Sequence, residues 1–150
     1  MGLALEEAEK GYRLGEVPVG AVLVGADGQI LAKACNMPIA SNDPTAHAEI
    51  LAIRSASARI GNYRLPETFI YVTLEPCAMC VGAMLHGRVK RLVFGAHDPR
   101  SGAAGSVLDL TGIVRLNHRI EVTRGVLAEN CAEILRRFFK ERRSWNRSKN

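Results

Sequence analysis

TAHAE, residues 45–49, and EPCAMC, residues 75–80, are the two stretches from which the fold of this chain can be worked out. In the second stretch Pro76 suits the first turn of a helix, because proline lacks the N–H that has no partner there. Cys77 and Cys80 are three residues apart, so a turn of helix places both sulfurs on one side. Both stretches therefore predict helix N-termini that carry metal-binding side chains.

These side chains have the composition of a zinc site. Closely spaced cysteines at a helix N-terminus ionise readily and make a zinc ligand pair, for which His47 is the natural third ligand. Glu49 would point about 200° away from His47 on a regular helix, so both face one site only at a helix start, which Asp43 or Thr45 can cap. Three ligands leave one zinc position open, where a water can be activated, and Glu49 is suited to carrying its proton.

Two other interpretations of the cysteine pair remain open. The pair is also typical of a structural zinc half-site or of a redox pair. A structural site needs a fourth ligand, for which the candidates are His86, His97, Cys35 and Cys131. A redox pair would leave His47 and Glu49 without a role. The two stretches together favour catalytic zinc.

The rest of the chain alternates strands and helices. Hydrophobic periodicity and turn residues predict helices at residues 3–14, 46–59, 77–85 and 128–143, and strands at 17–24, 29–34, 68–74, 89–95 and 120–123. A loop with two prolines is expected at 36–45. This order predicts an α/β fold in which a sheet with a parallel part is covered by helices on both faces. Residues 1–150 are expected to form one domain.

Charge is concentrated at the C-terminal end. Residues 136–150 carry seven basic side chains and one acidic side chain, whereas the other 135 residues have a net charge of −1. Such an end favours a polyanionic partner, although a solvated helix end would look the same. After Phe139 the only large apolar side chain is Trp145, so residues 142–150 are expected to lie mostly beyond the packed part of the final helix.

Composition also bears on location. The sequence has no run of about 18 apolar residues, which predicts no membrane span. The N-terminus lacks the basic start and apolar stretch of a secretory signal, so a cytoplasmic location is expected. Thiols stay reduced in that compartment, and Cys35 and Cys131 are interpreted as small buried residues.

The motifs together resemble those of bacterial tRNA adenosine deaminases, in the cytidine deaminase-like superfamily of zinc deaminases. The short zinc motif marks the superfamily, and a fuller set of motifs narrows the resemblance to the tRNA branch. That set is GEVPVGA (15–21), Asn36, DPTAHAE (43–49), YVTLEPCAMC (71–80), VFGA (93–96) with Asp98, GAAGS (102–106), NHR (117–119) and Phe138-Phe139.

The resemblance implies a three-layer α/β/α fold with a five-stranded mixed sheet, and a homodimer with active sites near the interface. It implies one Zn²⁺ per chain on His47, Cys77 and Cys80, with Glu49 as proton shuttle. The implied reaction is hydrolytic deamination of the wobble adenosine of a tRNA to inosine. The resemblance implies that the protein binds the anticodon stem-loop through five residues. These are Asn36 at the flipped base, Asp98 beside the sugar-phosphate chain, and Phe139, Arg142 and Arg143 at the basic end.

Two other functions compete with this interpretation. One is deamination of a free cytidine, guanine or deoxynucleotide with the same zinc machinery, which would not need the basic end. The other is a zinc-stabilised RNA-binding module without catalysis, which would have no use for Glu49. From the residues alone, Asn36 could also be only a turn residue, and His86 and His97 are structural or near the substrate.

Overall fold

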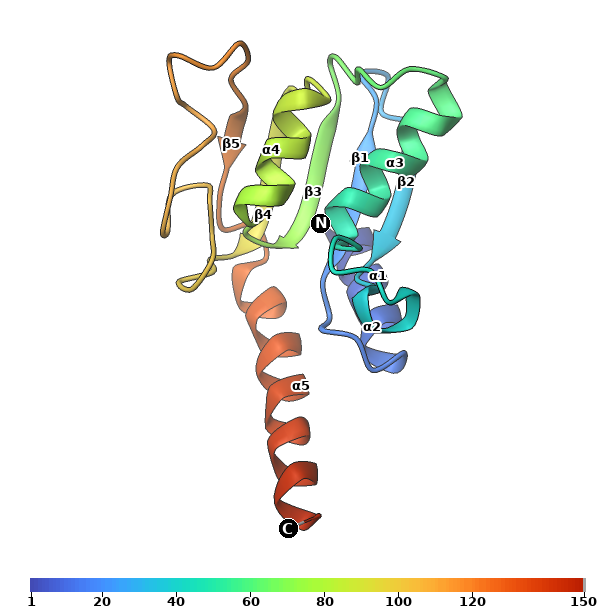
Figure 1. Ribbon diagram of the computed structural model, residues 1–150, viewed down its shortest axis with the longest axis vertical. Coiled ribbons are helices and arrows are strands. Elements are labelled where there is room, and N and C mark those ends of the chain that lie inside the picture. Colours follow the sequence, from blue (N-terminus) through green and yellow to red (C-terminus); the bar gives the residue numbers. More distant parts are fainter. Residues whose placement is uncertain (150) are drawn as a thin grey trace.

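A five-stranded mixed sheet forms the middle layer of the computed structural model, which describes residues 1–149 (Figure 1). Its strand order is β2-β1-β3-β4-β5. β1 is antiparallel to β2 and β3, whereas β4 is parallel to β3 and β5. The strands are β1 (Gly20–Val24), β2 (Ile30–Cys35), β3 (Phe69–Leu74), β4 (Arg91–Ala96) and β5 (Glu121–Thr123). The predicted fold class is confirmed.

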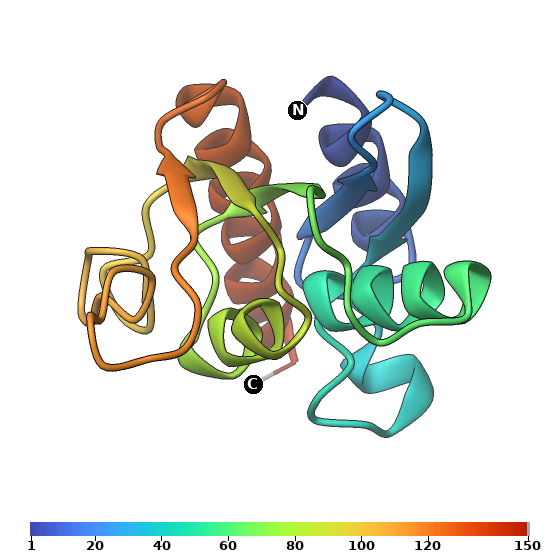
Figure 2. The same cartoon turned by 90° about the horizontal axis from the view of Figure 1, so that it is seen from above.

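Helices cover both faces of this sheet. α3 (Ala48–Ile60) and α4 (Ala78–His86) lie on one face, and α1 (Gly2–Arg13) and α5 (Ala128–Ser148) on the other (Figures 1 and 2). Because β1, β3 and β4 are covered on both sides, they are almost entirely buried and read as continuous apolar runs in the sequence. α4 makes the crossover between the parallel strands β3 and β4.

Two glycines set how closely helices approach the second face. A Cβ at Gly20 of β1 would overlap the Ala4 carbonyl oxygen of α1, and one at Gly95 of β4 would lie 2.9 Å from the Cys131 Cβ of α5. Only glycine permits such an approach, so both positions fix a helix directly on the sheet. Cys131 is buried there, as predicted.

The structure corrects the sequence-based prediction in three places. The loop expected at 36–45 contains a short helix, α2 (Pro38–Ser41), and the first strand begins at Gly20 rather than at residue 17. The final helix does not end near Arg143 but continues to Ser148, because its Arg, Lys and Glu side chains favour helix. Residue 150, the last of the predicted tail, lies outside the described residues.

The topology brings several element ends to one edge of the sheet. β3 and β4 end at this edge, α3 and α4 begin there, and α5 projects beyond it (Figure 1). The carboxyl ends of parallel strands are the usual location of ligand sites in α/β folds. Within the described range, the helices are too short or too polar to cross a bilayer.

Candidate metal centre and adjoining cavities

His47, Cys77 and Cys80 meet at this edge although they come from two helices. His47 is the N-cap of α3 and Cys77 the N-cap of α4, both with extended backbone, and Cys80 lies one turn into α4. His47 Nδ1 is 3.6 Å from Cys77 Sγ and 3.5 Å from Cys80 Sγ, and the two sulfurs are 3.7 Å apart. In the described part of the chain, this is the one group of three or more such side chains close enough to share a metal ion.

The three distances fit zinc. Zinc–sulfur bonds of about 2.3 Å and zinc–nitrogen bonds of about 2.0–2.1 Å at tetrahedral angles require S···S of about 3.8 Å and N···S of about 3.6 Å. The observed separations agree with these values to about 0.1 Å. His86, His97, Cys35 and Cys131 do not belong to the group, so the described residues offer no fourth side-chain ligand. This pattern matches a catalytic zinc site better than a structural one.

The electrostatics of the group favour an ionised ligand. Hydrogen bonds from Cys80 and then from His47 lower the pKa of Cys77 to about 4, against the opposing effect of burial. The hydrogen bond with Cys77 in turn raises the pKa of His47. A thiolate is the form in which cysteine binds metal, so Cys77 is prepared for a cation, whereas the hydrogen bond with Cys77 and burial raise the pKa of Cys80.

Glu49 lies beside the trio, in the first turn of α3. The extended backbone of His47 allows both side chains to line one cavity, as the sequence predicts. Glu49 is almost fully buried, and this burial raises the pKa of its carboxyl to about 7. A buried carboxyl at a metal centre is suited to holding and releasing a proton.

The helix start is held by a residue other than the predicted caps. Asp43 Oδ1 accepts the N–H and hydroxyl of Thr45 and so stabilises the preceding turn. The first N–H of α3, that of Ala48, is instead bound by Asn36 Oδ1 at 2.8 Å. Asn36 is therefore more than a turn residue, because its side chain fixes the helix that carries Glu49.

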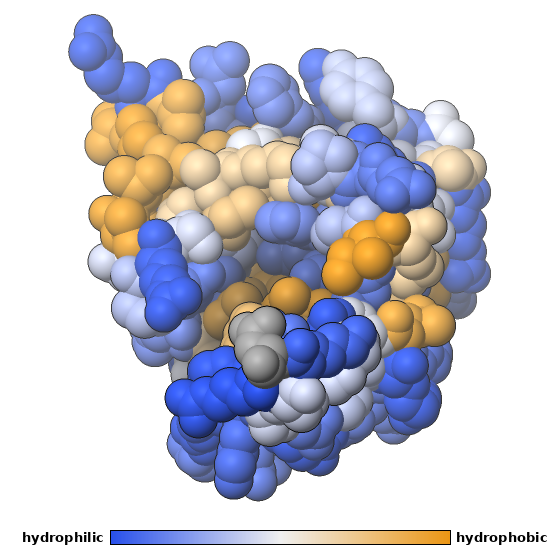
Figure 3. Space-filling model, turned by 60° about the horizontal axis from the view of Figure 1, so that its bottom comes forward, coloured by the Kyte–Doolittle hydropathy of each residue, from blue (hydrophilic) through white to orange (hydrophobic). Residues whose placement is uncertain are grey.

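The trio opens into a cavity of about 280 Å³ at the hollowed end of the molecule (Figure 3). Pro38 and Ile39 of α2 form one wall, and the 97–101 loop forms another. The lining residues are Glu16, Val17, Val19, Asn36, Pro38, Ile39, His47, Glu49, Leu74, Glu75, Cys77, Asp98 and Ser101. Its size and its polar groups suit a small planar ligand such as a nucleobase.

Glu75 organises one wall, although the sequence analysis assigned it no role. This buried carboxylate accepts hydrogen bonds from the backbone N–H groups of Asp98, Ala104 and Ser106 at 3.0–3.1 Å. Burial acts to raise the pKa of Glu75, but these bonds and the Ser106 hydroxyl hold the pKa below its usual value. A side chain at Gly102 would collide with this carboxylate. Glu75 thus fixes the 97–106 loop against the cysteine-bearing turn.

Glu16 has the same function at the opposite wall. It is 1% exposed, and its carboxylate accepts the N–H groups of Ile39 and Ala40 at 3.3 and 2.8 Å. These are N–H groups at the start of α2, which have no partner within so short a helix. Glu16 therefore holds α2 over the cavity.

Asp98, which the resemblance places beside the sugar-phosphate chain, lies in the cavity wall, but its carboxylate oxygens already have partners. Oδ1 accepts the N–H groups of Arg100 and Ser101, and Oδ2 accepts the Ser101 hydroxyl at 2.7 Å. In this structure Asp98 shapes its own loop.

A second cavity of about 440 Å³ adjoins the first. The two share Val17, Leu74, Asp98 and Ser101, and α5 closes the second with Leu135, Phe139 and Arg143. Phe139 is 44% exposed, and Phe138 is buried behind it. Two of the predicted RNA-binding residues, Phe139 and Arg143, are thus at the site.

Arg142, the third predicted RNA-binding residue on α5, does not line either of these two cavities. Its guanidinium donates to the Gly15 carbonyl oxygen and lies over the Phe138 ring, 5.2 Å from the centroid. It joins α5 to the loop that leads to Glu16.

Comparisons with known proteins find deaminases among the relatives of this chain. A model of the cytidine and deoxycytidylate deaminase zinc-binding region matches residues 1–96. The tRNA-specific adenosine deaminase of Haemophilus influenzae is 53% identical over 143 residues, which cover 95% of this chain and 83% of that protein. Its counterpart in Bacillus subtilis is 46% identical over 140 residues, which cover 93% of this chain and 86% of that protein.

Solved structures show the same fold. One from work on A-to-I editing by tRNA:A34 deaminases superposes with a TM-score of 0.86 at 44% identity, covering 90% of this chain and 97% of the other. The guanine deaminase of Nitrosomonas europaea superposes with a TM-score of 0.80 at 25% identity, covering 91% and 81%. A deaminase that acts on a free base therefore shares the fold at a lower sequence identity.

Proposed function

The chain belongs to the zinc-binding cytidine and deoxycytidylate deaminase family, and within it to the tRNA-specific adenosine deaminases. We propose that it hydrolyses the wobble adenosine of a tRNA anticodon to inosine and ammonia. The observation that carries this proposal is the combination at one cavity of a three-ligand metal centre, the buried Glu49 and an amide donor, beside a second cavity lined by α5.

Each step needs a group that this cavity contains. His47, Cys77 and Cys80 would hold zinc, which when bound would supply Lewis-acid activation of a water molecule. Glu49 would take one proton from that water and pass it to the ring nitrogen of adenine as the water oxygen bonds to C6. It would then move the second proton, from the new C6 hydroxyl, to the amine as the C6–N bond breaks, which leaves inosine and ammonia. Burial of Glu49 keeps bulk water from exchanging these protons during the reaction.

Asn36 supplies a means of orienting the base. Its Oδ1 accepts the Ala48 N–H, so the amide is held in one orientation and its Nδ2 hydrogens are left to face the cavity. A donor in this position can bind an acceptor on the edge of a base that has been extruded from an RNA loop. The hydrogen bond from the Ala48 N–H to Asn36 Oδ1 therefore holds in place both the start of the helix that carries Glu49 and the amide that contacts the base.

An RNA substrate is favoured over a free nucleoside by what surrounds the cavity. The cavity continues into the second one, where Phe139 is available to stack on a neighbouring base and Arg143 to contact a phosphate. A free cytidine or guanine would occupy only the first cavity. The residues with a net charge of +6 at positions 136–150 also suit a polyanion.

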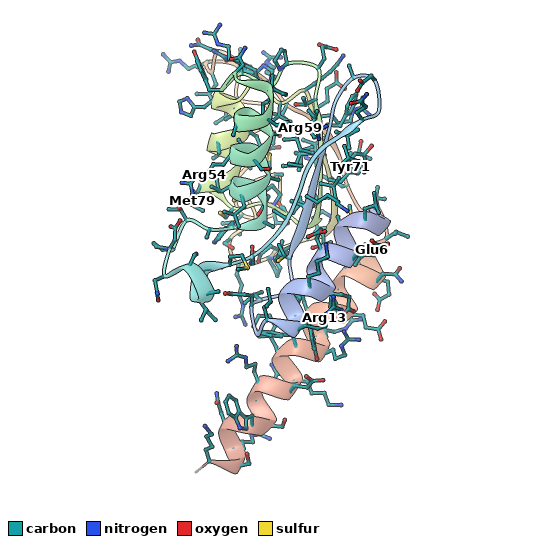
Figure 4. The ribbon with its side chains drawn as sticks, turned by 90° about the vertical axis from the view of Figure 1, so that its right-hand side faces the viewer. Glu6, Arg13, Arg54, Arg59, Tyr71 and Met79 are labelled. Carbon is teal, nitrogen blue, oxygen red and sulfur yellow. The ribbon has the colours of Figure 1, made fainter. Side chains whose placement is uncertain are left out.

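We also propose a homodimer formed through the outer surface of α3 and α4. Met79 and Arg54 project from these helices away from the sheet (Figure 4). Met79 is 37% exposed, the position of a Cβ on Gly82 is open, and the partly exposed Leu116 lines a pocket beside Gly82. Apolar side chains exposed around a small residue suit a close, self-complementary contact.

Sedimentation tests the dimer. Gly82→Arg should convert a dimer to a monomer, whereas Leu3→Arg, on the opposite layer, should leave it intact. A wild-type chain that sediments as a monomer at micromolar concentration would remove this proposal.

Because tRNA is a cytoplasmic molecule in bacteria, we propose that the enzyme is located in the cytoplasm.

The function itself is tested by a choice of substrates. The zinc-loaded protein is incubated with a stem-loop that carries adenosine at the wobble position, with the same stem-loop carrying adenosine elsewhere, and with free cytidine and guanine. Nucleoside analysis by mass should find inosine only from the first. Turnover of cytidine or guanine without turnover of the stem-loop would establish a small-molecule deaminase instead.

A further inference from the structure

A second groove, lined by aromatic side chains, lies on a different side of α5 from the cavity that Phe139 lines. It has a volume of about 340 Å³ and is lined by Tyr12, Gly15, Phe138, Glu141, Arg142 and Trp145. We call it the Trp145 groove. Trp145 is 54% exposed and is the single tryptophan of the chain. Exposure of such a large aromatic ring to water is unfavourable, so a half-exposed indole in a groove is a candidate contact surface.

The walls of the groove are fixed before any partner arrives. The Tyr12 hydroxyl donates to Glu141, and the Tyr12 ring packs edge-on against Phe138 with centroids 5.6 Å apart. Arg142 is held by the Gly15 carbonyl oxygen and covers the other side of Phe138. A ligand that enters therefore meets a preorganised surface, which lowers the entropy cost of binding.

Some basic side chains of α5 are free of ion pairs and can contact a polyanion, although they lie on the side of the helix away from the groove. Arg136 and Arg137 are paired with Glu129 and Glu9. Lys140, Arg143 and Arg147, in contrast, form no ion pair within residues 1–149, but their spacing places them along the side of α5 opposite to Trp145.

A further cation lies on the aromatic surface itself. The ammonium group of Lys149 is 4.1 Å from the centroid of the Trp145 ring. An exposed aromatic face with a cation beside it is a combination that binds single-stranded nucleic acid, with a base stacked on the ring and a phosphate on the cation. Glu141 is the one acidic side chain among the lining residues, and the Tyr12 hydroxyl already occupies it.

We propose that the Trp145 groove binds an unpaired base of the same RNA whose adenosine enters the catalytic cavity. The inference rests on the proposed function, because it takes the RNA as the substrate. The Gly15–Val17 segment separates the groove from the catalytic cavity, since Gly15 lines the first and Val17 the second. An RNA strand that crosses this segment reaches both sites at once, with α5 as its support.

The unique tryptophan provides a direct readout. The zinc-loaded Glu49→Ala protein, which binds without turnover, is titrated with a fluorophore-labelled adenosine stem-loop. Trp145 emission and probe anisotropy are followed together. Stacking of a base on the indole quenches its emission, so quenching should follow the anisotropy with the same Kd. An increase in anisotropy with unchanged Trp145 emission would overturn the proposal.

A set of variants gives an independent measurement. Trp145→Ala should raise the Kd for the stem-loop by about 5- to 150-fold, the range expected for loss of one stacked base. Trp145→Phe, which keeps an aromatic face, should recover most of this loss. Ile60→Ala, an equally exposed apolar position at the far end of α3, should bind as wild type does. Equal Kd values for Trp145→Ala and wild type, at equal melting temperatures, would overturn the proposal.

Failure of the Trp145 groove proposal and failure of the proposed function give different experimental results. If the stem-loop is deaminated but neither quenches Trp145 nor depends on it, the groove proposal is wrong and the function stands. If the stem-loop binds and quenches Trp145 but is never deaminated by the wild-type enzyme, the groove is an RNA site and the proposed function is wrong.

Discussion

Asn36→Asp and Asn36→Ala separate two tasks that the structure gives to one side chain. Oδ1 accepts the Ala48 N–H at 2.8 Å, and Nδ2 is left to face the base cavity. Aspartate keeps an oxygen for the Ala48 N–H, where its charge also suits a helix N-terminus, but it cannot donate to the base. Alanine loses both groups. If Asn36 only contacted the base, Asn36→Ala would leave the fold intact, whereas the cap on α3 predicts a loss of stability.

The two variants should therefore differ in stability but not in the direction of their effect on activity. Alanine leaves a buried N–H unpaired, which costs about 1–3 kcal/mol and lowers Tm by about 2–12 °C for a domain of this size. Aspartate should melt within about 2 °C of wild type. Both lose the contact with the base, so kcat/KM should fall by at least about 5- to 150-fold.

The assay is inosine formation from a stem-loop with adenosine at the wobble position, measured beside a calorimetric melting curve for each variant. Wild-type kcat/KM in Asn36→Asp would show that Nδ2 does not contact the base. A wild-type Tm in Asn36→Ala would show that the Ala48 N–H does not depend on this side chain. Either result would refute the corresponding half of the reasoning.

Four further changes test other parts of the site and fold. Glu49→Gln should lower kcat by about 10²- to 10⁴-fold with full zinc content by elemental analysis, whereas loss of zinc would make Glu49 a ligand. Cys80→Ser should lower both the zinc content, normally one per chain, and Tm, and unchanged values would exclude it as a ligand. Gly95→Ala should cost about 1–3 kcal/mol in a denaturant melt through overpacking against α5, and a neutral effect would contradict that contact. Arg143→Gln should weaken RNA binding and reduce the slope of log affinity against log salt by about 0.7, whereas Arg136→Gln, whose arginine is already paired, should not.

The metal centre could be predicted from sequence because its chemistry depends on residue type and on local geometry. Thiolates three residues apart on a helical turn converge without help from the rest of the fold, and His47 needs only an extended N-cap to join them. The prediction that Glu49 and His47 share a site followed from the same local argument. The class of the fold could be predicted for a similar reason, since hydrophobic periodicity is a local property.

The walls of the cavity could not be predicted in this way. Glu16 and Glu75 are ordinary acidic residues in the sequence, and their partners are backbone N–H groups 23 to 31 residues away. Backbone donors carry no side-chain signal, so no pattern of residues indicates which carboxylate will bind them. Burial provides the signal in the structure, because a carboxylate is buried only when its charge is compensated.

The C-terminal helix shows how a largely correct sequence-based expectation can miss one structural contact. The absence of apolar periodicity after Phe139 indicated that residues 142–150 lie outside the packed structure, and their removal would then affect RNA binding alone. Residues 143–149 are exposed, but Arg142 binds the Gly15 carbonyl oxygen and covers Phe138. Gly15 precedes Glu16, which holds α2 over the cavity. Truncation before Arg142 would therefore disturb the base cavity as well as the RNA surface, and only point variants of the unpaired cations can separate binding from folding.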